Sequence, residues 1–84
     1  MKLFPNPANQ YLIVEYNFKD KFTTGQFGEI TITTIQGQKI IHKLIYKSTD
    51  QVLITTSTLP VGTFLCTLTL SGKVLETQRF IIVR

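Results

Sequence analysis

The sequence is poor in the residues that carry catalysis and metal binding. It has one cysteine, Cys66, and one histidine, His42, among 84 residues. A lone cysteine cannot close a disulfide within the chain, and neither residue has the neighbouring ligands that a zinc site needs. The acidic residues also stand singly, at Glu15, Asp20, Glu29, Asp50 and Glu76. Because no pair of carboxylates points to acid–base catalysis or calcium binding, we expect no enzyme, no metal and no cofactor.

Long apolar stretches and clustered glycines are also missing. No run approaches the roughly 20 apolar residues that a membrane helix needs, so we expect no transmembrane segment. Pro5 and Pro7 interrupt the apolar start of the chain, so we expect no signal peptide in these residues. The glycines stand where turns are expected, and the serines lack the flanking glycines of a nucleophile elbow. These features again argue against catalysis and phosphate binding.

Residues that favour strands dominate the sequence. Hydrophobic residues make up 43% of the chain and charged residues 17%, a balance too apolar for disorder. Apolar residues recur at every second position over most of the length, which predicts strands at 11–16, 29–35, 38–47, 52–56, 63–70 and 73–84. A short edge strand around Phe22 would be a seventh. We therefore predict an all-β fold, a small immunoglobulin-like antiparallel β-sandwich of six or seven strands.

Turn residues separate the predicted strands. The pairs Gln36-Gly37 and Ser71-Gly72 predict tight turns, because glycine adopts positive φ without a steric cost. Residues 59–62 predict a tight connection, and residues 48–51 a polar turn. Residues 17–27, with two lysines, Asp20 and Gly25, are expected to form a loop.

One segment, residues 38–47, is compatible with two structures. Its apolar residues would also line one side of a short helix: Ile40, Ile41, Leu44 and Ile45. No capping residue stands just before it, and β-branched isoleucines disfavour a helix near the shortest useful length. We therefore predict a strand.

The net charge of +4 makes nucleic acid a partner to consider. Lys39, Lys43 and Lys47 would share one face of a strand, and such a row fits either a solvated edge strand or a contact with anions. The aromatic residue Phe64 alternates with Cys66 and Leu68, which is the pattern of a core rather than of a stacking platform. We therefore expect no nucleic acid partner.

Three stretches occur in an order that resembles a known family: LFPNPANQYLIV, ITITTIQGQKI and LPVGTFLCTLTLSGKVLETQRFIIVR. Together they resemble the type A C-terminal sorting domain of the type IX (Por) secretion system of Bacteroidota. Members have a Tyr-Pro-Asn-Pro opening, a strand followed by Asp-Leu-x-Gly, a Leu-Pro-x-Gly-x-Tyr turn and an apolar, basic C-terminus. This chain departs from the pattern at Phe4, Thr34 and Phe64, which stand for Tyr, Asp and Tyr.

The resemblance implies a single C-terminal sorting domain over residues 1–84, with a linker boundary and Pro-Asn-Pro lead-in at 1–7 and a β-sandwich at 8–84. Such domains follow a cargo domain on the same precursor, so we expect a piece of a longer protein. They pass through the periplasm and are recognised by outer-membrane components of the type IX machinery. A sortase-like protease then commonly removes them, upstream of Leu3 in this chain, and the cargo stays on the outer-membrane surface or is secreted.

The resemblance also implies which residues take part in recognition: Pro5, Asn6, Pro7, Gly37, Gly62, Phe64, Phe80, Ile81, Ile82, Val83 and Arg84. The glycines fit turns under any interpretation, and Phe64 fits a core position. The apolar end at Phe80 to Arg84 could bind a partner by strand addition, since an exposed terminal strand can pair with the edge of another sheet.

A second function class remains compatible with the sequence. An adhesion or carbohydrate-binding β-sandwich of a secreted protein would present exposed aromatic rings, and without tryptophan the chain offers Tyr11, Tyr16, Tyr46 and phenylalanines. Exposed edge strands would also allow a dimer.

Overall fold

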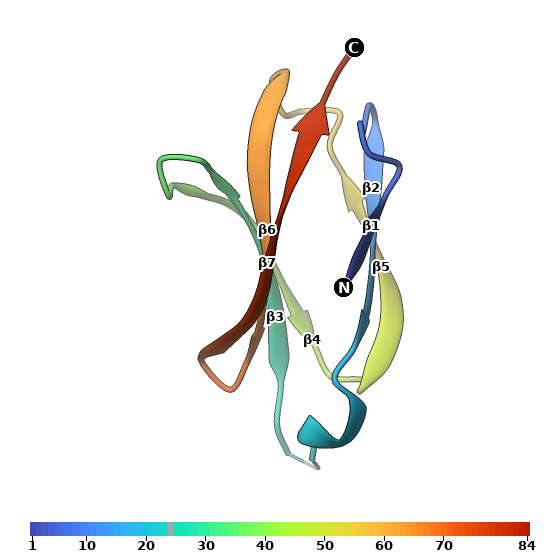
Figure 1. Ribbon diagram of the computed structural model, residues 1–84, viewed down its shortest axis with the longest axis vertical. Helices are drawn as coiled ribbons and strands as arrows, with labels where there is room; N and C mark the ends of the chain where they lie inside the picture. The colour runs from blue at the N-terminus through green and yellow to red at the C-terminus, as the bar shows by residue number, and fades with distance from the viewer. Residues whose placement is uncertain (24) are drawn as a thin grey trace.

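The computed structural model (Figure 1) describes residues 1–23 and 25–84. Two antiparallel sheets form the two layers of a small β-sandwich, which confirms the predicted fold class. One sheet has the order β1-β2-β5, with β1 at Lys2–Phe4, β2 at Tyr11–Asn17 and β5 at Thr49–Thr55. The other has the order β4-β3-β6-β7, with β3 at Gly28–Thr34, β4 at Lys39–Ile45, β6 at Gly62–Leu70 and β7 at Lys73–Ile82.

The strand order is that of an immunoglobulin-like sandwich. In that nomenclature the three-stranded sheet corresponds to strands A, B and E, and the four-stranded sheet to C′, C, F and G. The edge strands are β1 and β5 in one sheet and β4 and β7 in the other. The last strand of the chain is therefore an edge strand.

The core lies between the sheets and is built by alternation along the strands. In β6 every second side chain is buried, from Phe64 through Cys66 and Leu68 to Leu70. The residues between them, Leu65, Thr67 and Thr69, are only partly buried. The inner residues of the other strands complete it: Leu12, Val14 and Tyr16; Ile30 and Ile32; Ile45; Ile54; Phe80 and Ile82. The predicted alternation thus set which face of each strand is buried.

The ambiguous segment is a strand, as predicted. β4 pairs antiparallel with β3, and Ile41 lies opposite Ile32 in the register. At this edge position Lys39 and Lys43 are exposed, which is typical of edge strands that resist pairing with other chains.

Two predictions at the N-terminal sheet were wrong. Residues 48–51 were expected to be a turn, but β5 begins at Thr49, and Asp50 pairs with Tyr16 in the β2 ladder. This end of the edge strand is exposed, so no apolar alternation marks it. The lead-in at 1–7 was expected to lie outside a sandwich starting at residue 8, but Lys2–Phe4 forms β1 and pairs with β2.

The loop expected over 17–27 contains a short 3-10 helix, η1, at Lys19–Lys21. The edge strand expected around Phe22 is not formed, because Phe22 instead stacks on the buried ring of Phe18 with 5.4 Å between ring centroids. Residue 24 of this predicted loop lies outside the described residues. β7 ends at Ile82, two residues before the predicted end of its strand.

Gly28 provides a test of how tightly this end of the core is packed. A Cβ at this position would lie 2.5 Å from Phe18 Cζ and 3.1 Å from the Thr69 carbonyl oxygen. We expect Gly28→Ala to lower the free energy of unfolding by about 1–3 kcal/mol, as overpacking does, measured by urea denaturation. If the clash with the ring is the cause, the cost of Gly28→Ala should shrink in a Phe18→Leu background; an equal cost there would contradict it.

Candidate recognition site

At the C-terminal end of β7, side chains point alternately into the core and out to solvent. Phe80 and Ile82 are fully buried, whereas Ile81 and Val83 are each 43% exposed. Phe80 lies opposite Phe64 in the ladder, and their rings stack with 5.8 Å between centroids. This end of the chain is thus held by its inner residues and offers its outer residues to solvent.

Two of the other predicted residues support this end from the neighbouring strand. Gly62 pairs with Ile82, and its φ of +152° favours glycine. Phe64 is buried under Phe80, as its alternation predicted. We infer that Gly62, Phe64, Phe80 and Ile82 shape the end of β7 from within and have no exposed surface comparable to that of Ile81.

The Pro-Asn-Pro lead-in lies against the same end of β7. The side-chain oxygen of Asn6 accepts a hydrogen bond from Ile81 N–H at 3.2 Å. Ala8 N–H donates to the Ile81 carbonyl at 2.8 Å, and Val83 N–H donates to the Ala8 carbonyl at 2.9 Å. Ala8 and Ile82 thus form a parallel bridge, and the segment between β1 and β2 lies against the end of β7.

Pro5 and Pro7 flank Asn6 and are exposed. The Phe4-Pro5 and Asn6-Pro7 peptide bonds are both cis. Neither proline has a backbone N–H, so between Pro5 and Ala8 the hydrogen bonds to β7 come from Asn6 and Ala8.

The last residue is anchored by the turn after β5. The Arg84 guanidinium donates to the Thr56 carbonyl oxygen at 2.6 Å. Thr56 is fully buried, and its hydroxyl donates to the Asn9 carbonyl at 3.1 Å. Ala8 and Thr56 were both missed by sequence reasoning, because a small residue after a proline and a threonine before a turn carry no signal of such contacts.

The remaining part of the β7 edge is open. Successive residues of an antiparallel strand direct their backbone groups alternately toward the partner strand and away from it. Since the N–H and carbonyl of Ile81 point away from β6, those of Arg79 and Thr77 do so too. In the described part of the chain no segment pairs with these two residues from outside the sheet.

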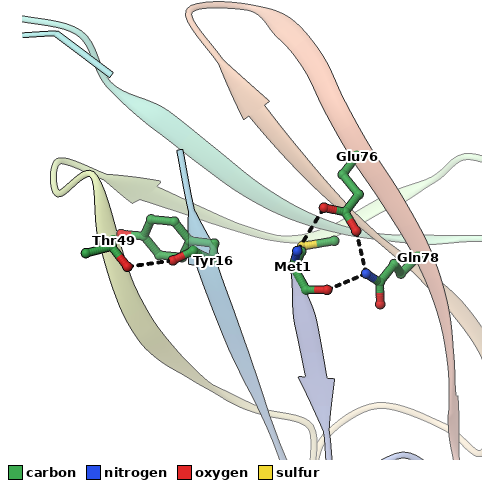
Figure 2. A network of polar contacts seen from close by, with 5 residues as sticks. All are labelled: Met1, Tyr16, Thr49, Glu76 and Gln78. Atoms are coloured by element: carbon green, nitrogen blue, oxygen red, sulfur yellow. Dashed lines mark hydrogen bonds and ion pairs between the residues drawn. The ribbon is translucent and has the colours of Figure 1, made fainter. Parts of the chain in front are cut away.

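A polar network joins the start of β1 to β7 from the inner side of this edge (Figure 2). The Met1 amino group contacts Glu76 Oε1 at 2.9 Å, and the Gln78 side-chain amide donates to both Glu76 and the Met1 carbonyl. The hydrogen bond from the amino group, with a second from Gln78, lowers the pKa of the Glu76 carboxyl. Across β2, the Thr49 hydroxyl donates to the Tyr16 carbonyl at 3.1 Å.

Gly37 is the predicted residue that lies apart from the others. It occupies the β3–β4 turn with φ +95°, and its N–H donates to the Thr34 carbonyl at 2.9 Å. In the sheet order β6 lies between β3, where this turn begins, and β7. Gly37 therefore serves the turn and does not join the cluster at the end of β7.

The described residues hold few groups suited to metal binding or nucleophilic catalysis. Among residues 1–23 and 25–84, no group of three or more histidine, cysteine or acidic side chains could hold a metal ion. Burial raises the pKa of the Cys66 thiol to about 12, with a further contribution from the charge of Glu76, so the thiol is neutral at physiological pH. Within the described residues, no helix is long and apolar enough to span a membrane.

The chain was compared with models of known protein families. The model of a family described as secretion system C-terminal sorting domain matches residues 2–83, nearly the whole chain. No curated protein matches it.

Proposed function

The chain belongs to the secretion system C-terminal sorting domain family, and from this membership we propose that the end of β7 is the part that the type IX machinery recognises. The domain is a C-terminal sorting signal of the type IX system and interacts with that machinery on behalf of cargo on the same precursor. It serves export across the outer membrane to the cell surface or the medium. The family is not an enzyme family.

The observation that carries the proposal is that β7 is an edge strand with exposed apolar side chains at its end. Ile81 and Val83 project outward, and Arg79 and Arg84 are exposed beside them. An edge strand pairs with an added strand through backbone hydrogen bonds, while alternate side chains enter pockets of the partner. Arg79 and Thr77 supply open backbone groups, and Ile81 and Val83 supply the side chains that would give selectivity.

The same proposal covers the route and the boundary of the domain. Residues 1–84 act as one sorting domain that passes through the periplasm, and a sortase-like protease then cuts upstream of Leu3. Because β1 is paired with β2, a cut on the N-terminal side of β1 would leave the sandwich intact. Flexible linkers outside paired strands are preferred sites of proteolysis, which supports this position.

The test replaces the outward residues without disturbing the core. Deleting residues 81–84 would also remove the buried Ile82, so the sharper variant is Ile81→Ser with Val83→Ser in a secreted reporter fusion. We expect the secreted fraction to fall about tenfold or more, since the partner loses two apolar contacts worth roughly 1–2 kcal/mol each.

The matched control is Leu44→Ser with Val74→Ser, two apolar residues on β4 and at the start of β7 that are 51% and 60% exposed, away from the end of β7. This control should be secreted like the parent. Normal secretion of the Ile81 and Val83 variant, with its fold intact by circular dichroism, would refute recognition through these side chains.

A further inference from the structure

The edge at the end of β7 already holds an extended segment. Residues 6–8, called the strap below, occupy the N–H and carbonyl of Ile81 and the N–H of Val83. These are the backbone groups that an added strand would need at the exposed side chains. The site in the free domain is therefore filled, and its occupant belongs to the chain itself.

The strap is held on β7 by few contacts. Two backbone hydrogen bonds of Ala8 and one acceptor from the Asn6 side chain hold it there, and each such bond has a modest net value against water. Pro7 and Asn6 are exposed, and the N-terminal neighbour Pro5 is exposed as well. Ala8 alone is fully buried, opposite the buried Ile82. Such a weak attachment favours replacement of the strap by another strand over permanent binding to β7.

We propose that the strap is a placeholder, and that a strand of the secretion machinery displaces it and pairs with Ile81 and Val83 in its stead. The inference rests on the proposed function, since it names how the same site is engaged. The strap itself shows what fits: an extended segment parallel to β7, with a small side chain at the position of Ala8, where the surroundings leave no exposed surface. A bulky residue there would displace the core around Ile82.

Exchange would couple the two ends of the chain. The strap continues through Pro5 into β1, so its release from β7 frees the connection between β1 and β2. Engagement of the C-terminal end would thereby loosen residues 5–10, which join β1 to β2, while β1 itself stays paired with β2.

The first test uses amide hydrogen exchange of the 84-residue chain, followed by NMR. Asn6→Ala removes the acceptor of Ile81 N–H, Asn6→Asp keeps an oxygen there, and Asn9→Ala is the control at an exposed asparagine of the same segment. We expect Asn6→Ala to accelerate exchange about tenfold at both Ile81 and Val83. Acceleration at Val83 is the decisive readout, because its acceptor is the Ala8 carbonyl and not Asn6. Unchanged exchange at Val83 would overturn the placeholder.

The second test supplies the strap from outside. A synthetic peptide with the sequence of residues 3–10, LFPNPANQ, should restore protection of Ile81 and Val83 in the Asn6→Ala variant. The peptide LFPNPVNQ, with valine at the position of Ala8, should restore at least tenfold less. Equal protection by both peptides, or by neither, would overturn the proposed fit.

Secretion separates this inference from the proposed function. In the reporter fusion, Asn6→Ala should raise the secreted fraction above that of the parent, because the placeholder is easier to displace. A clear loss of secretion by a folded Asn6→Ala variant would overturn the placeholder and make Asn6 a contact. The exchange experiments need no secretion machinery. Their outcome would therefore stand even if the serine variants at Ile81 and Val83 were secreted normally and refuted the proposed function.

Discussion

Phe80→Ala is expected to lower the free energy of unfolding by about 3–5 kcal/mol, the usual cost of truncating a buried phenylalanine. Phe80 is fully buried on β7 and stacks on Phe64 of β6, so the cavity would open under the end of the last strand. Small domains have roughly 5–15 kcal/mol in total, and the variant would therefore be close to unfolding. Urea denaturation followed by circular dichroism measures the change.

The matched control is Phe27→Ala, at a ring that is 42% exposed. It should cost about 1 kcal/mol or less, as changes at exposed positions do. The comparison also separates two roles of Phe80. A Phe80→Ala variant that keeps its stability and loses secretion would contradict a core role and would make this ring a direct contact of the machinery.

Strict alternation is what made most of the fold predictable. In β6 apolar residues recur at every second position from Phe64 to Leu70, so its inner face could be assigned from the sequence, and Phe64 is a core residue as predicted. For residues 38–47, where β4 lies, the missing helix cap, the short length and the β-branched isoleucines favoured the strand. Glycine at positive φ placed the turn at Gly37 correctly.

Two edge elements of the three-stranded sheet, β1 and the start of β5, escaped prediction because they bury little. The first residues of β5 are polar and exposed, so nothing in them distinguishes a strand from a turn. β1 has three residues, fewer than any periodic pattern requires. Both strands are held by backbone pairing with β2. The sequence of a strand does not show which other strand will pair with it.

The candidate site shows the same division. The exposed and buried sides of residues 80–83 follow from alternation along β7. The contact of Asn6 and Ala8 with Ile81 does not, because it joins residues about 75 positions apart through backbone groups that every residue has. Family resemblance named both ends as recognition elements. The contact between them suggests why the lead-in and the apolar C-terminus occur together: residues 6–8 cover the end of β7.

Stability is expected to fall steeply in alkali, because two buried acids keep their protons in the folded state. Burial raises the pKa of Tyr16 from its ordinary value of 10.0 to about 12, with a smaller contribution from Asp50, and burial likewise raises that of Cys66 from 9.0 to about 12. The unfolded chain loses these protons first, so it binds fewer protons than the folded chain and stability decreases as pH rises. The stabilisation is complete below about pH 9 and is lost between pH 9 and 12. It amounts to about 3 kcal/mol for Tyr16 and about 4 kcal/mol for Cys66 at 1.36 kcal/mol per pKa unit.

Tyr16→Phe isolates the contribution of the tyrosine. It removes the hydrogen bond from the Tyr16 hydroxyl to the Lys47 carbonyl, which costs about 1 kcal/mol at every pH. Between pH 10 and 12, however, this variant should lose about 3 kcal/mol less than the parent in urea denaturation, because no phenol remains to ionise. Tyr46→Phe, at an exposed ring, is the control and should follow the parent curve. If Tyr16→Phe and the parent decline in parallel, the Tyr16 hydroxyl ionises as readily in the folded chain as in the unfolded one, and the alkaline loss must come from another group in the core.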